Sequence, residues 1–241
     1  MTIEYYGVGK RLEEAARLCR SLCCGRIILL PLPTSKDGKY IKDTDIPLDE
    51  TLKEANRDTR IVGYALPDAY KEKCEQIGAK VLDLSLDERF VLENARLTAL
   101  ATVGYLLSSF ESDPTQLKIG VTGYGRIGKA IVRILLFLGA HPTVYTTRPE
   151  LAEALAECGI SSVCGYPCSF SGLDVLINTA PRDMRDSIKD AAMRPGRILE
   201  VASGKNFEGI EGVEFLNALP EKIYPISAAV AYFEAVKRWL L

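Results

Sequence analysis

The sequence predicts an α/β protein built from two parallel-sheet domains, and three observations support this prediction. Short apolar runs alternate with amphipathic helical patterns along nearly the whole chain, which is typical of parallel sheets covered by helices. One apolar run leads directly into a glycine-rich turn and a helical pattern, within residues 117–148. A long helical pattern at 87–110 separates two such alternating regions. With 241 residues, the chain is long enough for two domains of about 100–120 residues each.

The first region alternates apolar runs with helical patterns. The helical pattern at 10–23 places Leu12, Ala15 and Cys19 on one face, and Pro33 follows the second apolar run directly. A polar stretch at 34–46 contains an Asp-Gly turn. We predict strands at 2–6, 26–32, 60–65 and 80–84, and helices at 10–23, 48–56 and 67–77.

The second region follows a polar linker at 111–115, which Pro114 interrupts. We predict strands at 119–121, 143–145, 161–163, 175–177, 197–201 and 213–216, and helices after the glycine turn and at 151–158, 184–193 and 227–240. The predicted division is a first domain at 1–92, a linking helix at 93–114, a second domain at 115–226 and a C-terminal helix at 227–241. We expect this last, apolar helix to pack back on the domain junction; a subunit interface is the alternative.

The turn after the strand at 119–121 has the spacing Gly-x-Gly-x-x-Gly. In a dinucleotide-binding Rossmann unit Gly123 permits the tight turn, Gly125 lets a pyrophosphate approach the backbone, and Gly128 lets helix and strand pack closely. The pyrophosphate binds the N–H groups at the helix start. The sequence therefore predicts a dinucleotide site formed by the loop residues Gly123, Tyr124, Gly125, Arg126, Ile127 and Gly128. A purely structural turn is the alternative.

The end of the next strand indicates which dinucleotide binds. An NAD site usually carries Asp or Glu about 20 residues past the turn, on the ribose hydroxyls. This chain has Thr146, Thr147 and Arg148 there, and hydroxyls and a guanidinium suit a 2′-phosphate. We therefore predict NADP, with NAD as the alternative because Glu150 is near. A solvated arginine in a loop is the other interpretation of Arg148.

Polar side chains also follow other predicted strands. Ligands of parallel sheets bind beyond the carboxyl ends of the strands. In the second domain these ends present Asn178, Thr179, Ala180 and Pro181, then Ser203 and Lys205, and finally Asn217. In the first domain Thr34, Ser35 and Lys36 follow a strand, where they could bind an anionic group or form an ordinary surface turn.

Composition narrows the function classes. The chain is 47% hydrophobic and 26% charged, and 30 Lys and Arg residues stand against 32 Asp and Glu residues, so no nucleic-acid partner is expected. No signal pattern or membrane-length apolar stretch is apparent, so we expect a cytoplasmic protein without a membrane partner. The seven cysteines are an odd number and suit a reducing compartment. No metal site is predicted, because four suitable ligands do not come together in the sequence.

Several further motifs follow one another along the chain. They are LLPLPTSKDGKYI (29–41), NARLTA (94–99), YTTR (145–148), DVLINTAP (174–181), ILEVAS (198–203) and LPEKIYPISAA (219–229). The glycine turn is generic, but LLPLPTSKDG, DVLINTAP and LPEKIYP in this order are more discriminating. Together these motifs resemble the family of dipicolinate synthase A subunits, which is related to the D-2-hydroxyacid dehydrogenases. The similarity spans about residues 26–240.

The resemblance implies a flavodoxin-like first domain that binds substrate, a linking helix and a Rossmann domain that binds NADP. It implies oxidation of a dihydrodipicolinate-type dicarboxylate to pyridine-2,6-dicarboxylate, as in sporulation, in partnership with a flavoprotein B subunit; we also expect a homo-oligomer. It carries over the turn, the 2′-phosphate edge and Asn178, Thr179 and Pro181 as cofactor-binding positions. The substrate-binding candidates are Thr34, Ser35, Asn94, Arg96, Thr98 and Ser203.

The sequence offers several candidates for an acid or a base. The 2-hydroxyacid dehydrogenases use a histidine, but His141 is the only histidine of this chain and precedes a strand. Forming an aromatic ring provides its own driving force; if a base is needed, the catalytic candidates are Lys222, Tyr224 and Lys205. Lys222 and Arg96 could equally bind a substrate carboxylate. The alternatives are a diverged dehydrogenase with another substrate and a non-catalytic or regulatory NAD(P)-binding subunit.

Overall fold

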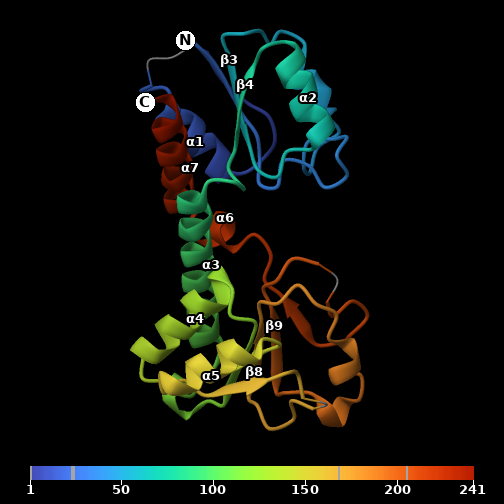
Figure 1. The fold of residues 1–241 in the computed structure, drawn as a ribbon, viewed down its shortest axis with the longest axis vertical. Helices are drawn as coiled ribbons and strands as arrows, with labels where there is room; N and C mark the ends of the chain where they lie inside the picture. The colour runs from blue at the N-terminus through green and yellow to red at the C-terminus, as the bar shows by residue number, and fades with distance from the viewer. Residues whose placement is uncertain (1, 23–24, 168, 205) are drawn as a thin grey trace. The chain divides into compact units, whose positions relative to one another are not determined.

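The computed structural model describes residues 2–22, 25–167, 169–204 and 206–241. The chain divides into two compact units: the first holds the residues up to Asn94 together with Pro220–Leu241, and the second holds Ala95–Leu219. Each unit contains one parallel sheet, and helices surround both sheets (Figure 1). The predicted fold class, α/β with two parallel-sheet domains, is confirmed. No helix within the described ranges has both the length and the apolar character needed to cross a membrane.

The first unit has a four-stranded sheet in the order β1-β2-β3-β4. Its elements are β1 (Thr2–Tyr5), α1 (Lys10–Cys19), β2 (Arg26–Leu29), the 3₁₀ helix η1 (Leu48–Leu52), β3 (Thr59–Gly63), α2 (Asp68–Gln76), β4 (Lys80–Asp83), the start of α3 (Glu88–Ser109), α6 (Leu219–Ile223) and α7 (Pro225–Leu240). The helix predicted at 10–23 thus ends at Cys19, and the helix predicted at 48–56 is a short 3₁₀ helix.

Helix α7 completes the core of the first unit. It runs beside α1 (Figure 1), and Tyr232 and Val236 of α7 share one buried cluster with Ala15 of α1. The Tyr232 hydroxyl accepts a hydrogen bond from Leu30 N (3.3 Å) and shares its proton between the carbonyl oxygens of Leu30 and Val62, both at 3.0 Å. The C-terminal helix therefore holds together the carboxyl ends of β2 and β3.

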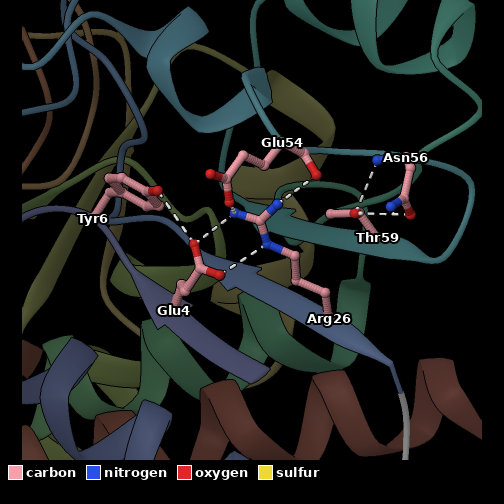
Figure 2. A network of polar contacts seen from close by, with 6 residues as sticks. All are labelled: Glu4, Tyr6, Arg26, Glu54, Asn56 and Thr59. Carbon is pink, nitrogen blue, oxygen red and sulfur yellow. Dashed lines mark hydrogen bonds and ion pairs between the residues drawn. The ribbon is translucent and has the colours of Figure 1, made fainter. Parts of the chain in front are cut away.

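A network of polar side chains joins β1 to β2 on the other side of the unit (Figure 2). The Arg26 guanidinium donates two parallel hydrogen bonds of 2.8 Å to the Glu4 carboxylate, and Tyr6 donates a third bond of 3.2 Å to it. Arg26 also donates to the Glu54 carbonyl oxygen. The hydrogen bond from Arg26 is the main cause that lowers the pKa of Glu4. The bidentate geometry makes this the kind of ion pair that contributes to stability.

We expect Glu4→Gln to lower the free energy of unfolding by about 1 kcal/mol at pH 7, because one bidentate, partly buried pair is lost. Since the pKa of Glu4 is lower in the folded state, this contribution is complete above the unfolded value of 4.5 and disappears as the pH falls through the folded value. Urea unfolding at several pH values measures it. Glu54→Gln is the control, because its carboxylate is 84% exposed and 3.7 Å from Arg26. Equal effects of both variants would contradict the assignment.

The second unit has a six-stranded sheet in the order β10-β9-β8-β5-β6-β7. Its elements are the rest of α3, the 3₁₀ helix η2 (Pro114–Gln116), β5 (Ile119–Thr122), α4 (Arg126–Phe137), β6 (Thr143–Thr146), α5 (Pro149–Glu157), β7 (Ser162–Cys164), β8 (Val175–Asn178), the 3₁₀ helices η3 (Arg185–Ser187) and η4 (Ala191–Met193), β9 (Arg197–Glu200) and β10 (Val213–Phe215). The strand order reverses between β5 and β8, the place where such sheets bind dinucleotides.

The prediction of a helix at 184–193 is wrong. The segment instead forms two separate 3₁₀ turns, η3 and η4. The Asp183 carboxylate accepts a bond from Arg185 N, and the Asp190 carboxylate accepts one from Ala192 N, both at 3.0 Å. Aspartates that bind their own backbone two residues on compete with helical hydrogen bonds, and this explains why the helical spacing of the apolar residues is misleading here.

Candidate functional site

The glycine turn lies at the carboxyl end of β5, in the middle of the six-stranded sheet. Gly123 has φ +82°, a left-handed conformation that favours glycine, and its N–H donates to the Tyr145 carbonyl oxygen at 2.8 Å. The turn is thereby fixed to the neighbouring strand β6. Helix α4 then begins at Arg126, so strand, turn and helix follow one another as a dinucleotide-binding unit requires.

Gly125 and Gly128 differ in what surrounds them. A Cβ atom on Gly128 would collide with the Gly123 carbonyl oxygen and lie 2.7 Å from Thr179 Oγ1. A Cβ atom on Gly125 would have no heavy atom within 4 Å. Gly128 therefore allows the helix and the turn to approach each other, whereas Gly125 leaves open space above the backbone. The close approach at Gly128 is the packing role that the sequence predicts, and the open space over Gly125 is where the sequence predicts a pyrophosphate.

The N-terminus of α4 suits an anion. No side chain caps it, its first turn holds no acidic residue, and the first helical hydrogen bond runs from Lys129 N to the Gly125 carbonyl oxygen. N–H groups of a first helical turn lack acceptors within the helix, and the helix dipole places partial positive charge there. A phosphate group is the natural ligand of such an end.

The end of β6 carries the residues predicted for a 2′-phosphate. Thr146 is buried, and its hydroxyl accepts a hydrogen bond of 3.3 Å from Arg148 N. Thr147 and Arg148 are exposed, as is Glu150 in the first turn of α5. Of the predicted trio, Thr147 and Arg148 have side chains accessible to a ligand, whereas Thr146 holds the bend after the strand.

Asn178 lies at the centre of a buried polar network. Its amide donates to both oxygens of the Glu200 carboxylate at 3.1 and 2.9 Å, and its carbonyl oxygen accepts from the Thr122 hydroxyl and from Ala180 N. These contacts link the ends of β5, β8 and β9, the three strands beside the glycine turn. Thr179 donates from its hydroxyl to the Thr122 carbonyl oxygen at 2.8 Å. Ala180 is buried, and Pro181 is exposed.

Glu200 is a site residue that sequence reasoning missed. Its side chain is almost fully buried, and it also accepts a bond of 2.8 Å from Ala202 N. Burial raises the pKa of Glu200, while the hydrogen bonds from Asn178 and Ala202 act in the opposite direction. The signal was a carboxylate at the end of an otherwise apolar strand, where only a buried polar partner makes it tolerable. The register, which pairs Glu200 with Asn178, supplies that partner.

The predicted substrate residues are spread over several elements. The Thr34 hydroxyl is fully buried and accepts a 2.8 Å bond from Tyr64 N, and Ser35 shapes its own turn by bonding to Asp37 and Gly38. On α3, Asn94 is half-buried, Arg96 is exposed and Thr98 is buried; in the second unit Ser203 is exposed after β9.

The predicted acid/base candidates are not in the sheet of the second unit. Lys222 is exposed on α6, and half-buried Tyr224 precedes α7, so both belong to the first unit. Lys205 lies outside the described residues. His141 is exposed before β6, and since the strands are parallel it lies at the edge opposite the glycine turn. Within the described ranges, no three His, Cys, Asp or Glu side chains gather as a metal ion would require.

Comparison with known proteins finds solved structures with a similar fold but no similar sequence. No family model matches the chain, and no curated protein matches it. The A subunit of dipicolinate synthase from Bacillus halodurans superposes with a TM-score of 0.78 at 17% identity, covering 99% of this chain and 97% of that chain. The corresponding polypeptide of dipicolinate synthase from Bacillus subtilis gives 0.77 at 17% identity, with coverages of 100% and 95%.

A dehydrogenase is also similar in structure, with a lower TM-score. D-lactate dehydrogenase from Escherichia coli has a TM-score of 0.54 at 14% identity, with coverages of 100% and 96%. At such identities the comparisons establish the fold. The resemblance to the dipicolinate synthase family that the sequence motifs indicate is thus confirmed at the level of the fold, and that fold is shared with dehydrogenases.

Proposed function

We propose that this chain is an NADP(H)-dependent oxidoreductase of the dipicolinate synthase type, which oxidises a dihydrodipicolinate-type precursor to pyridine-2,6-dicarboxylate. The observation that supports it most is the glycine turn at the strand-order reversal, with open space over Gly125 and an uncapped α4 N-terminus. The substrate is inferred from the sequence motifs together with the fold likeness to two dipicolinate synthase structures.

The residues present fit a nicotinamide dinucleotide phosphate. The α4 N–H groups would hold the pyrophosphate, and Thr147 and Arg148 would hold the 2′-phosphate, where no carboxylate at the strand end repels it. Thr179 and Pro181 would border the nicotinamide half. When bound, this cofactor accepts a hydride from the substrate. The Asn178 and Glu200 network keeps the strand ends beneath it in one arrangement.

The chain's own residues would bind and orient a substrate whose oxidation yields an aromatic ring, and would accept the proton that this oxidation releases. His141 lies at the opposite edge of the sheet from the turn, so a histidine base of the 2-hydroxyacid dehydrogenase type is not part of the proposal. Lys222 and Tyr224 remain the proposed proton acceptors. Following the resemblance, we also propose a flavoprotein partner and a homo-oligomeric state. Co-purification tests for the partner, and size-exclusion chromatography with light scattering measures the oligomeric state.

We expect Arg148→Ala to weaken NADPH binding about tenfold and to leave NADH binding unchanged, because a charge-assisted contact to phosphate contributes about 1.5 kcal/mol. Fluorescence titration of both nucleotides measures this. Arg133→Ala, which removes another exposed arginine from α4 of the same unit, is the control and should change neither affinity. Equal wild-type affinities for the two nucleotides, unaffected by Arg148→Ala, would refute the 2′-phosphate site.

Turnover separates the proposed reaction from the alternatives. Freshly generated dihydrodipicolinate and NADP⁺ should give the pyridine absorbance and NADPH together. If NADPH binds but no product forms in the presence or absence of a flavoprotein partner, the proposed reaction fails. A nucleotide-binding subunit without this activity would then be the better description.

A further inference from the structure

Arg11 is a buried charge for which the described residues offer no hydrogen-bonding partner. It is the second residue of α1, only 6% of its surface is exposed, and its Nε has no acceptor among the described residues. No ion pair or hydrogen bond of its guanidinium is found in that part of the chain. A guanidinium has five N–H donors, and the Nε donor of Arg11 is buried without an acceptor, which is unfavourable. Such an arrangement suits an anionic ligand.

The surroundings of Arg11 show where this anion would lie. Burial lowers the pKa of Arg11, and the carboxylate of Glu221 and the hydroxyl of Tyr232 oppose this electrostatically. The Tyr232 hydroxyl lies at the carboxyl ends of β2 and β3, because it donates to the carbonyl oxygens of Leu30 and Val62. Arg11 therefore lies at the ligand-binding edge of the first sheet, where parallel sheets take their ligands.

The N-terminus of α1 adds a second set of donors. Gly9 precedes the helix without a side-chain cap, and the first helical bonds run from Leu12 N and Glu13 N to the Gly9 carbonyl oxygen. The N–H groups of Lys10 and Arg11 consequently have no backbone acceptor within the helix. The partial positive charge of the helix end and the Arg11 guanidinium thus act at the same place.

A carboxylate of the chain itself already lies at this helix end. The Oε1 atom of Glu221, on α6, occupies the position that a Cβ on Gly9 would take, and its Cδ lies 3.1 Å from that position. Glu221 is nevertheless beyond ion-pair distance of Arg11. The same unit therefore places an anionic group over the helix end and leaves the adjacent guanidinium unpaired.

We propose that Arg11 and the N-terminus of α1 form a carboxylate-binding site in the first unit, and that Glu221 fills its outer part until a ligand carboxylate displaces it and pairs with Arg11. The identity of the ligand rests on the proposed function, which gives the substrate and the product two carboxylates each. Neither the glycine turn nor the Arg148 edge takes part, so the site is tested separately from the cofactor.

The test uses the full chain, without nucleotide, and pyridine-2,6-dicarboxylate as probe, with calorimetry for affinity and thermal unfolding for stability. Arg11→Met is expected to weaken binding of the probe at least tenfold. The unfolding temperature of the free protein should stay the same or rise, because a buried charge is removed. Glu221→Gln should bind the probe several-fold more tightly, since the competing carboxylate is gone. Arg17→Met, on the exposed face of α1, should change neither.

Two results would overturn the site. In one, Arg11→Met lowers the unfolding temperature and leaves the probe affinity unchanged, so Arg11 is structural. In the other, Glu221→Gln only destabilises the protein, so Glu221 is a counter-charge. Pyridine-2,6-dicarboxamide, which has the same shape without charge, should not bind. Binding of inorganic phosphate, with no binding of carboxylates, would refute the ligand class.

The same measurements distinguish this proposal from the proposed function. NADPH affinity should be equal in wild type and Arg11→Met. Arg11-dependent binding of malonate, with no binding of the pyridine dicarboxylate, would support the site and refute the assigned substrate. NADPH binding together with turnover, but with a probe affinity that does not depend on Arg11, would support the function and refute the site.

Discussion

Gly128→Ala is expected to lower the free energy of unfolding by about 2 kcal/mol and to abolish measurable NADPH binding. Its Cβ would collide with the Gly123 carbonyl oxygen and lie 2.7 Å from Thr179 Oγ1, so the turn must move away from α4. Overpacking of this kind costs about 3 kcal/mol, of which about 1 is regained from the better helix propensity of alanine. The turn that moves is the one proposed to bind the pyrophosphate. Urea unfolding and NADPH titration measure the two effects.

Gly125→Ala is the matched variant. Its Cβ would have no heavy atom within 4 Å, and φ −80° with ψ −162° is an ordinary conformation for alanine. Stability should change by no more than about 0.5 kcal/mol, while NADPH binding falls because a methyl group enters the space proposed for the pyrophosphate. Undiminished NADPH binding by Gly125→Ala would remove the ligand from this turn. Unchanged stability of Gly128→Ala would contradict the close approach.

Glu200→Leu is expected to cost about 3 kcal/mol of unfolding free energy at pH 7. The substitution leaves the fully buried Asn178 amide with the Ala180 carbonyl oxygen as its acceptor and removes the carboxylate from its other N–H, and a buried N–H without a partner costs about 1–3 kcal/mol. The Ala202 N–H loses one of its two acceptors as well. Because the ends of β5, β8 and β9 then lose their common link, we expect weaker NADPH binding alongside the loss of stability.

Glu200→Gln should change the pH dependence of stability in a defined direction. Burial raises the pKa of Glu200 above the unfolded value of 4.5, so the folded state holds this proton more tightly than the unfolded state does. The resulting stabilisation is complete below the unfolded pKa and is lost as the pH rises through the folded pKa. The stability of wild type minus that of Glu200→Gln should therefore fall across this interval and be constant above it.

Unfolding in urea from pH 4 to pH 8 measures this difference. Glu211→Gln, which changes an exposed carboxyl group of the same unit, should show no such slope. A wild-type stability that rises relative to Glu200→Gln over this interval would mean that the hydrogen bonds from Asn178 and Ala202 outweigh burial, and that Glu200 is held ionised.

The glycine turn and its flanking elements were predictable because their causes are local. The spacing of Gly123, Gly125 and Gly128 reflects contacts between residues at most a few positions apart, together with one neighbouring strand end. The apolar runs of the sheets were equally visible, since a buried parallel strand needs apolar residues on both faces. The helix at 184–193 was mispredicted because two aspartates satisfy backbone N–H groups locally, which apolar spacing does not reveal.

Glu200 and Arg11 could not be found in this way, because each depends on residues far along the chain. The partner of Glu200 is Asn178, on the adjacent strand and 22 positions earlier in the sequence. The neighbours of Arg11 come from α6 and α7, more than two hundred residues later. Arg11 belongs to no motif, and Glu200 was visible only as the carboxylate of the ILEVAS motif (198–203), at the end of an otherwise apolar strand.

The sequence by itself determined two parallel-sheet domains and the glycine turn between strand and helix, and it predicts a 2′-phosphate edge at Thr146, Thr147 and Arg148, because these follow from short-range periodicity and spacing. The tertiary structure alone decided that residues from Pro220 onward complete the first unit and that Asn178 and Glu200 form one buried network. It also decided that the Arg11 Nε is buried with no acceptor among the residues that the structure describes. The physical reason is the same in each case. A polar group becomes a destabilising group or a specific binding partner only when segments that are distant in the sequence exclude water from it.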